Sequence, residues 1–304
     1  MDNAALLQQL EKLVSEGRNP RTMNLDTLSS LELAKIINDE DRVVADAVAA
    51  CIGEMAKTID AVVAAFNKGA RLIYIGAGTS GRLGVLDAVE CRPTFSVTDN
   101  VVVGVIAGGE KALIHAVEGA EDNYTGGKQD LIAENLSSDD VVIGSSASGR
   151  TPYVMGALDY ANELGCETAC IVCNPEAPLL KTAQIGICAT VGPECLTGST
   201  RMKSGTAQKL IMNTISTASM VRIGKVYENL MVDVNATNEK LVARAIRIVM
   251  QATECSQQQA EEALEKANKS AKLAILMILT GQDVEQAKDL LDVNSGNLRK
   301  AICR

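Results

Sequence analysis

Three hydroxyl side chains stand close together in the stretch SASGRTP, which follows the apolar run VVIG and Ser145. Ser146, Ser148 and Thr151 lie where a buried strand is expected to turn into a helix that begins near Pro152. Hydroxyl donors, backbone amides and the positive end of a helix together bind a single phosphate group. One or two such residues often do no more than cap a helix, but three in one turn favour a phosphate cradle.

A second loop carries glycines in the spacing G-x-G-x-x-G, at Gly76, Gly78 and Gly81, between the run RLIY and a helix-like segment. Such a loop holds either the pyrophosphate of a dinucleotide or a smaller anion. The dinucleotide interpretation also needs an acidic residue at the end of the next strand, about 20 residues further on. Asp99 has nearly that spacing but precedes the run VVVGVIAG. A nicotinamide dehydrogenase is therefore disfavoured.

The elements that must position these loops are visible as short apolar runs alternating with helix-like segments. This alternation predicts an α/β fold with a doubly wound parallel sheet covered by helices on both faces. Because ligands bind at the carboxyl ends of such strands, both loops should lie at one edge of the sheet. Helical periodicity marks the chain up to about Asn67 and again from about Asn238, so we expect a main domain over residues 1–237 and a small helical domain over 238–304. The five expected strands are RLIYIG, VVVGVIAG, DVVIGSS, TACIVCN and QIGICATV.

Composition narrows the class of protein. The net charge of −9 argues against nucleic-acid binding, which needs a basic face. No leader or membrane-length apolar run is visible, so a cytoplasmic protein with reduced cysteines is expected. Cys170 and Cys173 have C-x-x-C spacing, but on a strand two side chains three apart point to opposite faces. With His115 as the single histidine, no metal site is expected.

The SASGRT stretch resembles the phosphate loop of sugar isomerase (SIS) domains, which bind phosphosugars on a flavodoxin-like sheet. Longer blocks resemble the N-acetylmuramic acid 6-phosphate etherases, keep the order of that family and are spread over residues 76–241, more than half of the chain. The block that ends in Lys209 also resembles the glucokinase regulatory protein, a non-catalytic relative. One departure is Arg92, where the family pattern has proline. The blocks are GAGTSGRLGVLDAVECRPTF, AVEGAED, SASGRTPYV, GPECLTGSTRMKSGTAQK and NLMVDVNATNEKL.

The resemblance implies cleavage of the D-lactyl ether of N-acetylmuramic acid 6-phosphate, giving N-acetylglucosamine 6-phosphate and D-lactate during cell-wall recycling. Removal of the C2 proton of the opened sugar creates an enolate that expels lactate, and water then adds at C3. Such a reaction needs a base, an acid and a phosphate anchor, but neither a metal nor a nicotinamide cofactor. A non-catalytic phosphosugar sensor that regulates a partner protein is the alternative.

The resemblance also assigns roles to individual residues. Glu90 and Glu121 are the expected catalytic glutamates, and which of them acts as acid or base stays open. Glu90 should lie near the end of the helix that Gly81 opens, just before Pro93. The expected substrate-binding residues are Gly78, Thr79, Ser80, Ser146, Ser148, Gly149 and Thr151, with Arg201 and Lys203 as candidate cations for the lactyl carboxylate or the phosphate.

The spacing between Gly81 and Glu90 further predicts a homodimer. Nine residues of helix span about 13 Å, so Glu90 should project away from the cradle of its own chain. We therefore expect active sites that combine Ser146, Ser148 and Thr151 of one chain with Glu90 of the other, in a two-fold dimer.

Overall fold

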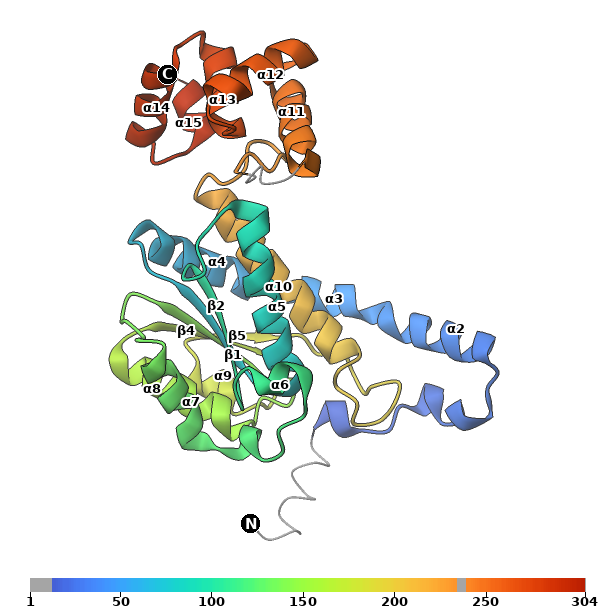
Figure 1. Cartoon of the computed structure of the whole chain (residues 1–304). Helices are drawn as coiled ribbons and strands as arrows, with labels where there is room; N and C mark the ends of the chain where they lie inside the picture. The colour runs from blue at the N-terminus through green and yellow to red at the C-terminus, as the bar shows by residue number, and fades with distance from the viewer. Residues whose placement is uncertain (1–12, 234–238, 304) are drawn as a thin grey trace. The chain divides into compact units, whose positions relative to one another are not determined.

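The computed structural model describes residues 13–233 and 239–303 (Figure 1). A parallel sheet of five strands has the order β2-β1-β3-β4-β5. Every strand coincides with one of the five apolar runs, so the predicted α/β class and the flavodoxin-like strand order are confirmed. The strands are β1 (Leu72–Gly76), β2 (Val102–Ile106), β3 (Val141–Ser145), β4 (Glu167–Val172) and β5 (Ile185–Cys188).

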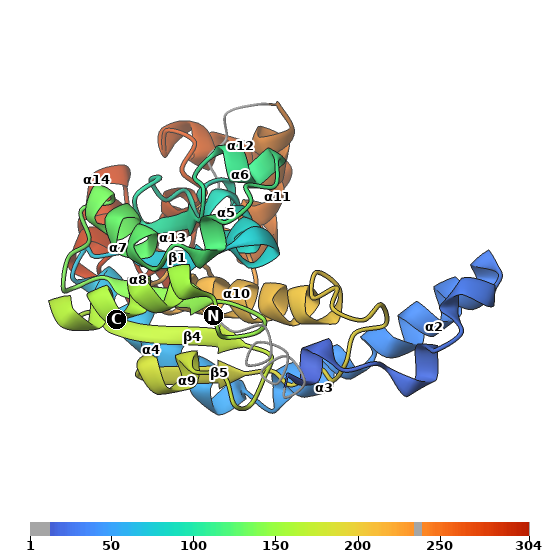
Figure 2. The ribbon, with the colours of Figure 1, turned by 90° about the horizontal axis from the view of Figure 1, so that it is seen from below.

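The sheet divides the surrounding helices into two layers. Side chains that alternate along a strand point to opposite faces. One face buries Ile73 and Ile75 of β1 in a core with Val154 and Leu158 of α8 (Pro152–Leu164). On the other face, the Tyr74 hydroxyl donates to the carbonyl of Met212, in α10 (Lys203–Arg222). Figure 2 shows α8 and α4 (Ile52–Asn67) on opposite faces of the sheet.

Nine α-helices lie between residues 13 and 233, and two of them, α2 (Ser30–Asp41) and α3 (Val43–Ala49), extend beyond the sheet in both views (Figures 1 and 2). The first predicted helical segment begins within residues 1–12, outside the described residues. The α-helices are α2 (Ser30–Asp41), α3 (Val43–Ala49), α4 (Ile52–Asn67), α5 (Gly78–Phe95), α6 (Lys111–Ile114), α7 (Tyr124–Ala133), α8 (Pro152–Leu164), α9 (Leu179–Thr182) and α10 (Lys203–Arg222). Short 3₁₀ turns are η1 (Val14–Glu16), η2 (Pro20–Thr22), η3 (Leu25–Thr27) and η4 (Ala120–Asp122).

Helices α7 and α8 approach so closely that only glycine fits at their contact. A Cβ added at Gly156 would lie 1.9 Å from the carbonyl oxygen of Tyr124, and one at Gly127 would lie 2.0 Å from that of Tyr153. We expect Gly156→Ala to lower the free energy of unfolding by about 1–3 kcal/mol, because overpacking outweighs the better helix propensity of alanine.

Thermal unfolding followed by circular dichroism measures this change. Gly53→Ala, in α4, is the matched control, because a Cβ there meets nothing within 4 Å. An equal or higher melting temperature for Gly156→Ala would show that the two helices can move apart without loss.

The chain forms two compact units, and each combines segments that are distant in the sequence. The first comprises residues 1–88 and 100–216, and the second comprises 89–99 and 217–304. The expected boundary at 237 and 238 lies outside the described residues, so it stays a prediction. None of the helices in the described ranges is long and apolar enough to span a membrane.

The second unit is helical and has its own core. Ala245, Ile248 and Val249 of α11 pack with Leu264 and Ile275 in this core. Its helices are α11 (Glu239–Thr253), α12 (Gln257–Lys266), α13 (Ala271–Thr280), α14 (Val284–Val293) and α15 (Leu298–Ile302).

Candidate active site

The two predicted anion-binding loops leave neighbouring strands at the carboxyl edge of the sheet. Strands β1 and β3 pair in parallel, with Gly76 opposite Ser145. Strand β2 lies on the other side of β1, so the winding direction of the chain changes between β1 and β3. This is the position at which doubly wound sheets bind ligands.

The hydroxyl cradle, formed by Ser146, Ser148 and Thr151, is brought together in one turn. The Oγ atom of Ser146 lies 3.3 Å from the Oγ of Ser148 and 2.8 Å from the Oγ1 of Thr151. The amide of Gly149 donates to Ser146 Oγ at 3.0 Å. Gly149 has a φ of 66°, and a Cβ there would lie 2.3 Å from the Cβ of Ala177. Glycine is therefore required for the turn that gathers the hydroxyls.

Helix capping alone does not account for these hydroxyls. Thr151 occupies the N-cap position of α8, yet its side chain makes no capping hydrogen bond. Its hydroxyl instead lies within hydrogen-bond distance of the Ser146 hydroxyl. Because the start of α8 lies directly after this cluster, the helix adds its positive end to the same place.

The glycine loop brings α5 against the end of β1. Gly78 has a φ of 53° and starts the helix, while a Cβ on Gly81 would lie 2.7 Å from the carbonyl oxygen of Gly76. Thr79 is half-buried at this end of the helix. The buried Ser80 donates to Oε1 of Gln208 at 2.9 Å, so its hydroxyl is already engaged with α10.

Two buried polar groups near this edge were missed by sequence analysis. Among the described residues, neither Nε2 of Gln208 nor Oγ of Ser145 has a hydrogen-bond partner. Ser145 directly precedes the predicted cradle, and its position in the sequence could have identified it as a further polar group of the site. Nothing in the sequence around Gln208 distinguishes it from other polar residues of a long helix.

Glu121 lies in the 3₁₀ turn η4 and is exposed. It lines a cavity of about 170 Å³ together with Gly78, Glu118 and Arg82. Arg82, which donates from Nε to the carbonyl of Leu113 at 3.2 Å, was not predicted, although it directly follows Gly81 of the glycine loop. A carboxylate and a guanidinium therefore share this cavity with the loop.

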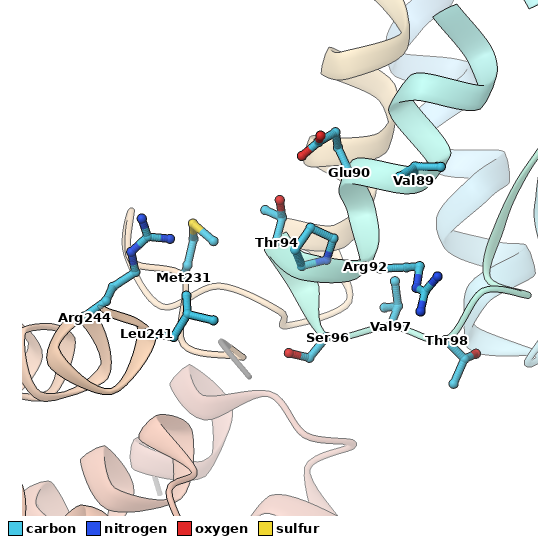
Figure 3. A pocket seen from close by; sticks show the side chains of 11 residues that line it. Val89, Glu90, Arg92, Thr94, Ser96, Val97, Thr98, Met231, Leu241 and Arg244 are labelled. Atoms are coloured by element: carbon cyan, nitrogen blue, oxygen red, sulfur yellow. The ribbon is translucent and has the colours of Figure 1, made fainter. Parts of the chain in front are cut away.

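Glu90 is exposed and lines a different, larger pocket of about 740 Å³ (Figure 3). Helix α5 runs unbroken past Gly84 to Phe95 and contains Pro93. The expectation that the helix ends just before Pro93 was wrong, because a proline in the last turn removes one donor without forcing the chain out of helical geometry. Glu90 and Glu121 thus line separate pockets of one chain.

The two candidate cations at the start of α10 have different surroundings. Arg201 is exposed, whereas Lys203 is buried and its Nζ lies 2.7 Å from Oε2 of Glu40. The backbone amide of Lys203 donates to Glu194 at 2.9 Å, and Ser204 also donates to this buried carboxylate. Lys203 therefore anchors the start of α10 against α2, and only Arg201 remains as a candidate for substrate.

The C-x-x-C pair is held inside the protein. The thiol of Cys170 donates to the carbonyl of Leu179 and that of Cys173 to Ser204. Burial raises the pKa of each thiol to about 12, which makes both poor nucleophiles and poor metal ligands. Within residues 13–233 and 239–303, no group of three or more potential ligands is arranged to hold a metal ion.

Three protein-family models match parts of the chain. The model of the glucokinase regulatory protein N-terminal SIS domain matches residues 54–162, and the SIS domain model matches residues 120–218. The model of the C-terminal lid domain of glucokinase regulatory protein matches residues 228–272.

Curated relatives match over the whole length. The N-acetylmuramic acid 6-phosphate etherase of Vibrio atlanticus is 59% identical over 302 residues, which is 99% of both chains. N-acetylmuramic acid 6-phosphate etherase 2 of Vibrio cholerae is 58% identical, and the N-acetylmuramic acid 6-phosphate etherase of Brucella anthropi is 57% identical; each match covers 99% of this chain and 98% of the relative. Identity at this level over the full length shows that the chain belongs to the N-acetylmuramic acid 6-phosphate etherase family.

Proposed function

We propose that this enzyme cleaves the D-lactyl ether of N-acetylmuramic acid 6-phosphate, releasing D-lactate and N-acetylglucosamine 6-phosphate. The observation that carries the proposal is the hydroxyl cradle at the switch point of the sheet, in a chain that also exposes Glu90 and Glu121 in pockets. The full-length relatives, which are named N-acetylmuramic acid 6-phosphate etherases, indicate the substrate.

The chemistry follows from the position of the ether on the sugar. An unactivated alkoxide leaves poorly, so direct hydrolysis of an ether is slow. In the open-chain sugar, C2 is adjacent to the C1 aldehyde, and loss of its proton gives an enolate. The enolate expels the lactyl oxygen from C3, and water then adds at C3 while a proton returns to C2. Each proton transfer by a positioned carboxylate is worth roughly 10²–10⁴ in rate.

The residues divide between anchoring and proton transfer. The hydroxyl cradle and the start of α8 hold the 6-phosphate, with Gly78 and Thr79 of the neighbouring loop and Arg201 as further contacts. Glu90 and Glu121 exchange protons with C2 and with the leaving oxygen. Carboxylates and water are sufficient for every step, so the reaction calls for no cofactor.

We further propose that the active site is shared between the chains of a homodimer. Helix α5 is continuous from Gly78 to Phe95, and the twelve steps from Gly78 to Glu90 span about 18 Å along its axis. A two-fold axis would bring Glu90 of each chain to the cradle of the other. The reaction belongs in the reducing cytoplasm, where the nine cysteines remain free thiols.

The phosphate anchor is tested by removing one hydroxyl. Ser148→Ala should weaken binding of N-acetylglucosamine 6-phosphate about 10- to 150-fold, because a hydrogen bond to a charged group contributes roughly 1.5–3 kcal/mol. Isothermal titration calorimetry measures the affinity. Ser138→Ala, in an exposed turn of the same unit, is the control. Unchanged affinity in a folded Ser148→Ala protein would remove the cradle from the site.

Incubation of the purified, dialysed protein with N-acetylmuramic acid 6-phosphate tests the function itself. D-Lactate should appear without any added cofactor and be detected with a D-lactate dehydrogenase assay. A non-catalytic phosphosugar sensor, which is suggested by the match to glucokinase regulatory protein models, would bind the sugar and release none.

A further inference from the structure

The Glu90 pocket lies within the second unit and is large enough for part of a sugar ligand. Its volume of about 740 Å³ falls in the range of small-molecule sites. It is lined by the end of α5, by the segment that follows it, by Met231 and by α11 (Figure 3). The lining residues are Val89, Glu90, Arg92, Pro93, Thr94, Ser96, Val97, Thr98, Met231, Leu241 and Arg244.

Two arginines line this pocket, and only one of them is available to an anion. Arg92 forms an ion pair with Asp99, and in Figure 3 its side chain is directed toward Thr98. Arg244 is exposed and makes no ion pair with any described residue. In a chain with a net charge of −9, an arginine without a carboxylate partner beside a predicted catalytic glutamate is well placed to bind a carboxylate.

Arg244 is held on the pocket side of a fixed helix. Ala245, Ile248 and Val249 on the same helix are buried in the core of the second unit. Leu241 lies one turn before Arg244 and therefore presents an apolar side chain next to the guanidinium. Figure 3 shows Met231 beside Arg244, with Glu90 and Thr94 on the other side of the pocket.

The segment that carries Met231 is fixed as well. Val232 is buried, and the carboxylate of Asp233 lies 2.7 Å from Nζ of Lys272 and 3.3 Å from Nζ of Lys225. The hydroxyl of Ser96 donates to the carbonyl of Asp233, which ties the chain after α5 to this segment. The apolar and cationic wall of the pocket is thus preorganised.

We propose that Arg244 binds the carboxylate of the lactyl group, with Met231 and Leu241 beside its methyl group. This inference rests on the proposed function, because the substrate then carries two anionic groups and the cradle takes only the phosphate. A planar guanidinium forms two parallel hydrogen bonds to a carboxylate. Held in this way, the lactyl ether oxygen lies on the side of the pocket that carries Glu90, where a proton is needed as lactate leaves.

The test compares two enzymes and two substrates. Arg244→Gln should lower kcat/KM for N-acetylmuramic acid 6-phosphate about 10- to 100-fold, as expected for loss of a charged hydrogen-bonded pair. With the analogue whose lactyl carboxylate is a carboxamide, wild-type and Arg244→Gln proteins should differ less than threefold. Arg247→Gln is the matched control, because Arg247 is exposed on the same helix but does not line the pocket.

Inhibition by N-acetylglucosamine 6-phosphate separates a lactyl contact from a structural effect. This product lacks the lactyl group, so its inhibition constant should be the same for wild-type and Arg244→Gln proteins. Equal losses with the carboxylate and carboxamide substrates, weaker product binding, or no loss at all would each overturn the role of Arg244. If the wild-type protein releases no lactate, the proposed function fails and the inference fails with it.

Discussion

Replacing Glu90 with glutamine should lower kcat for lactate release by about 10²–10⁴, the usual contribution of a positioned carboxylate to proton transfer. Glutamine keeps the size and polarity of the side chain but can neither take the proton from C2 nor return one to the leaving oxygen. Because Glu90 is exposed and forms no ion pair with any described residue, the substitution should leave the fold unchanged. Steady-state assays of lactate release measure the loss.

Affinity for the product serves as the internal reference for this variant. N-Acetylglucosamine 6-phosphate should bind Glu90→Gln and wild-type proteins equally, since the phosphate anchor is intact. Glu285→Gln, at an exposed position of α14, controls for loss of one negative charge. A Glu90→Gln protein that retains more than a tenth of wild-type kcat would exclude Glu90 as the residue that transfers these protons.

Two impaired variants should restore activity to each other when their subunits exchange. In a mixture of Glu90→Ala and Ser148→Ala proteins, random pairing makes about half of the dimers mixed, and each has one intact site of two. About a quarter of wild-type activity should therefore return. The assay is run with substrate below KM, where the weaker binding of Ser148→Ala leaves that parent protein with about a tenth of wild-type activity or less.

The complementary mixture gives the opposite expectation. A chain that carries both changes, mixed with an equal amount of wild-type chain, should leave only the wild-type homodimers active, about a quarter of the total. If each site is built from one chain, this mixture retains about half of the activity and the first mixture recovers none. Mass labels on the two chains verify that exchange has occurred.

The features that sequence analysis predicted correctly depend on local patterns. All five strands were recognised because each is a short apolar run between polar or glycine-containing ends. Ser146, Ser148 and Thr151 were brought together as expected because residues within one turn are neighbours in any strand-to-helix connection. The strands and the hydroxyl cradle could both be predicted because each depends only on residues that are close together in the sequence.

The features that were missed depend on contacts between distant segments. Lys203 was a candidate cation for the substrate, but Glu40, more than 160 residues earlier, neutralises it inside the protein. The second unit combines residues 89–99, at the end of α5 and just after it, with residues 217–304, which are more than 100 residues away in the sequence. Likewise, the pocket that joins Glu90 to Arg244 exists only once those segments are folded together.

The elimination mechanism is tested most directly by the reaction in labelled water. In water enriched in the heavy oxygen isotope, N-acetylglucosamine 6-phosphate should carry the label on its C3 hydroxyl, and in D₂O it should gain deuterium at C2. D-Lactate should carry no heavy oxygen from the solvent. Mass spectrometry and NMR of both products locate the labels. Heavy oxygen found only in the lactate, with no deuterium at C2, would mean that water attacks the lactyl carbon and would contradict the mechanism.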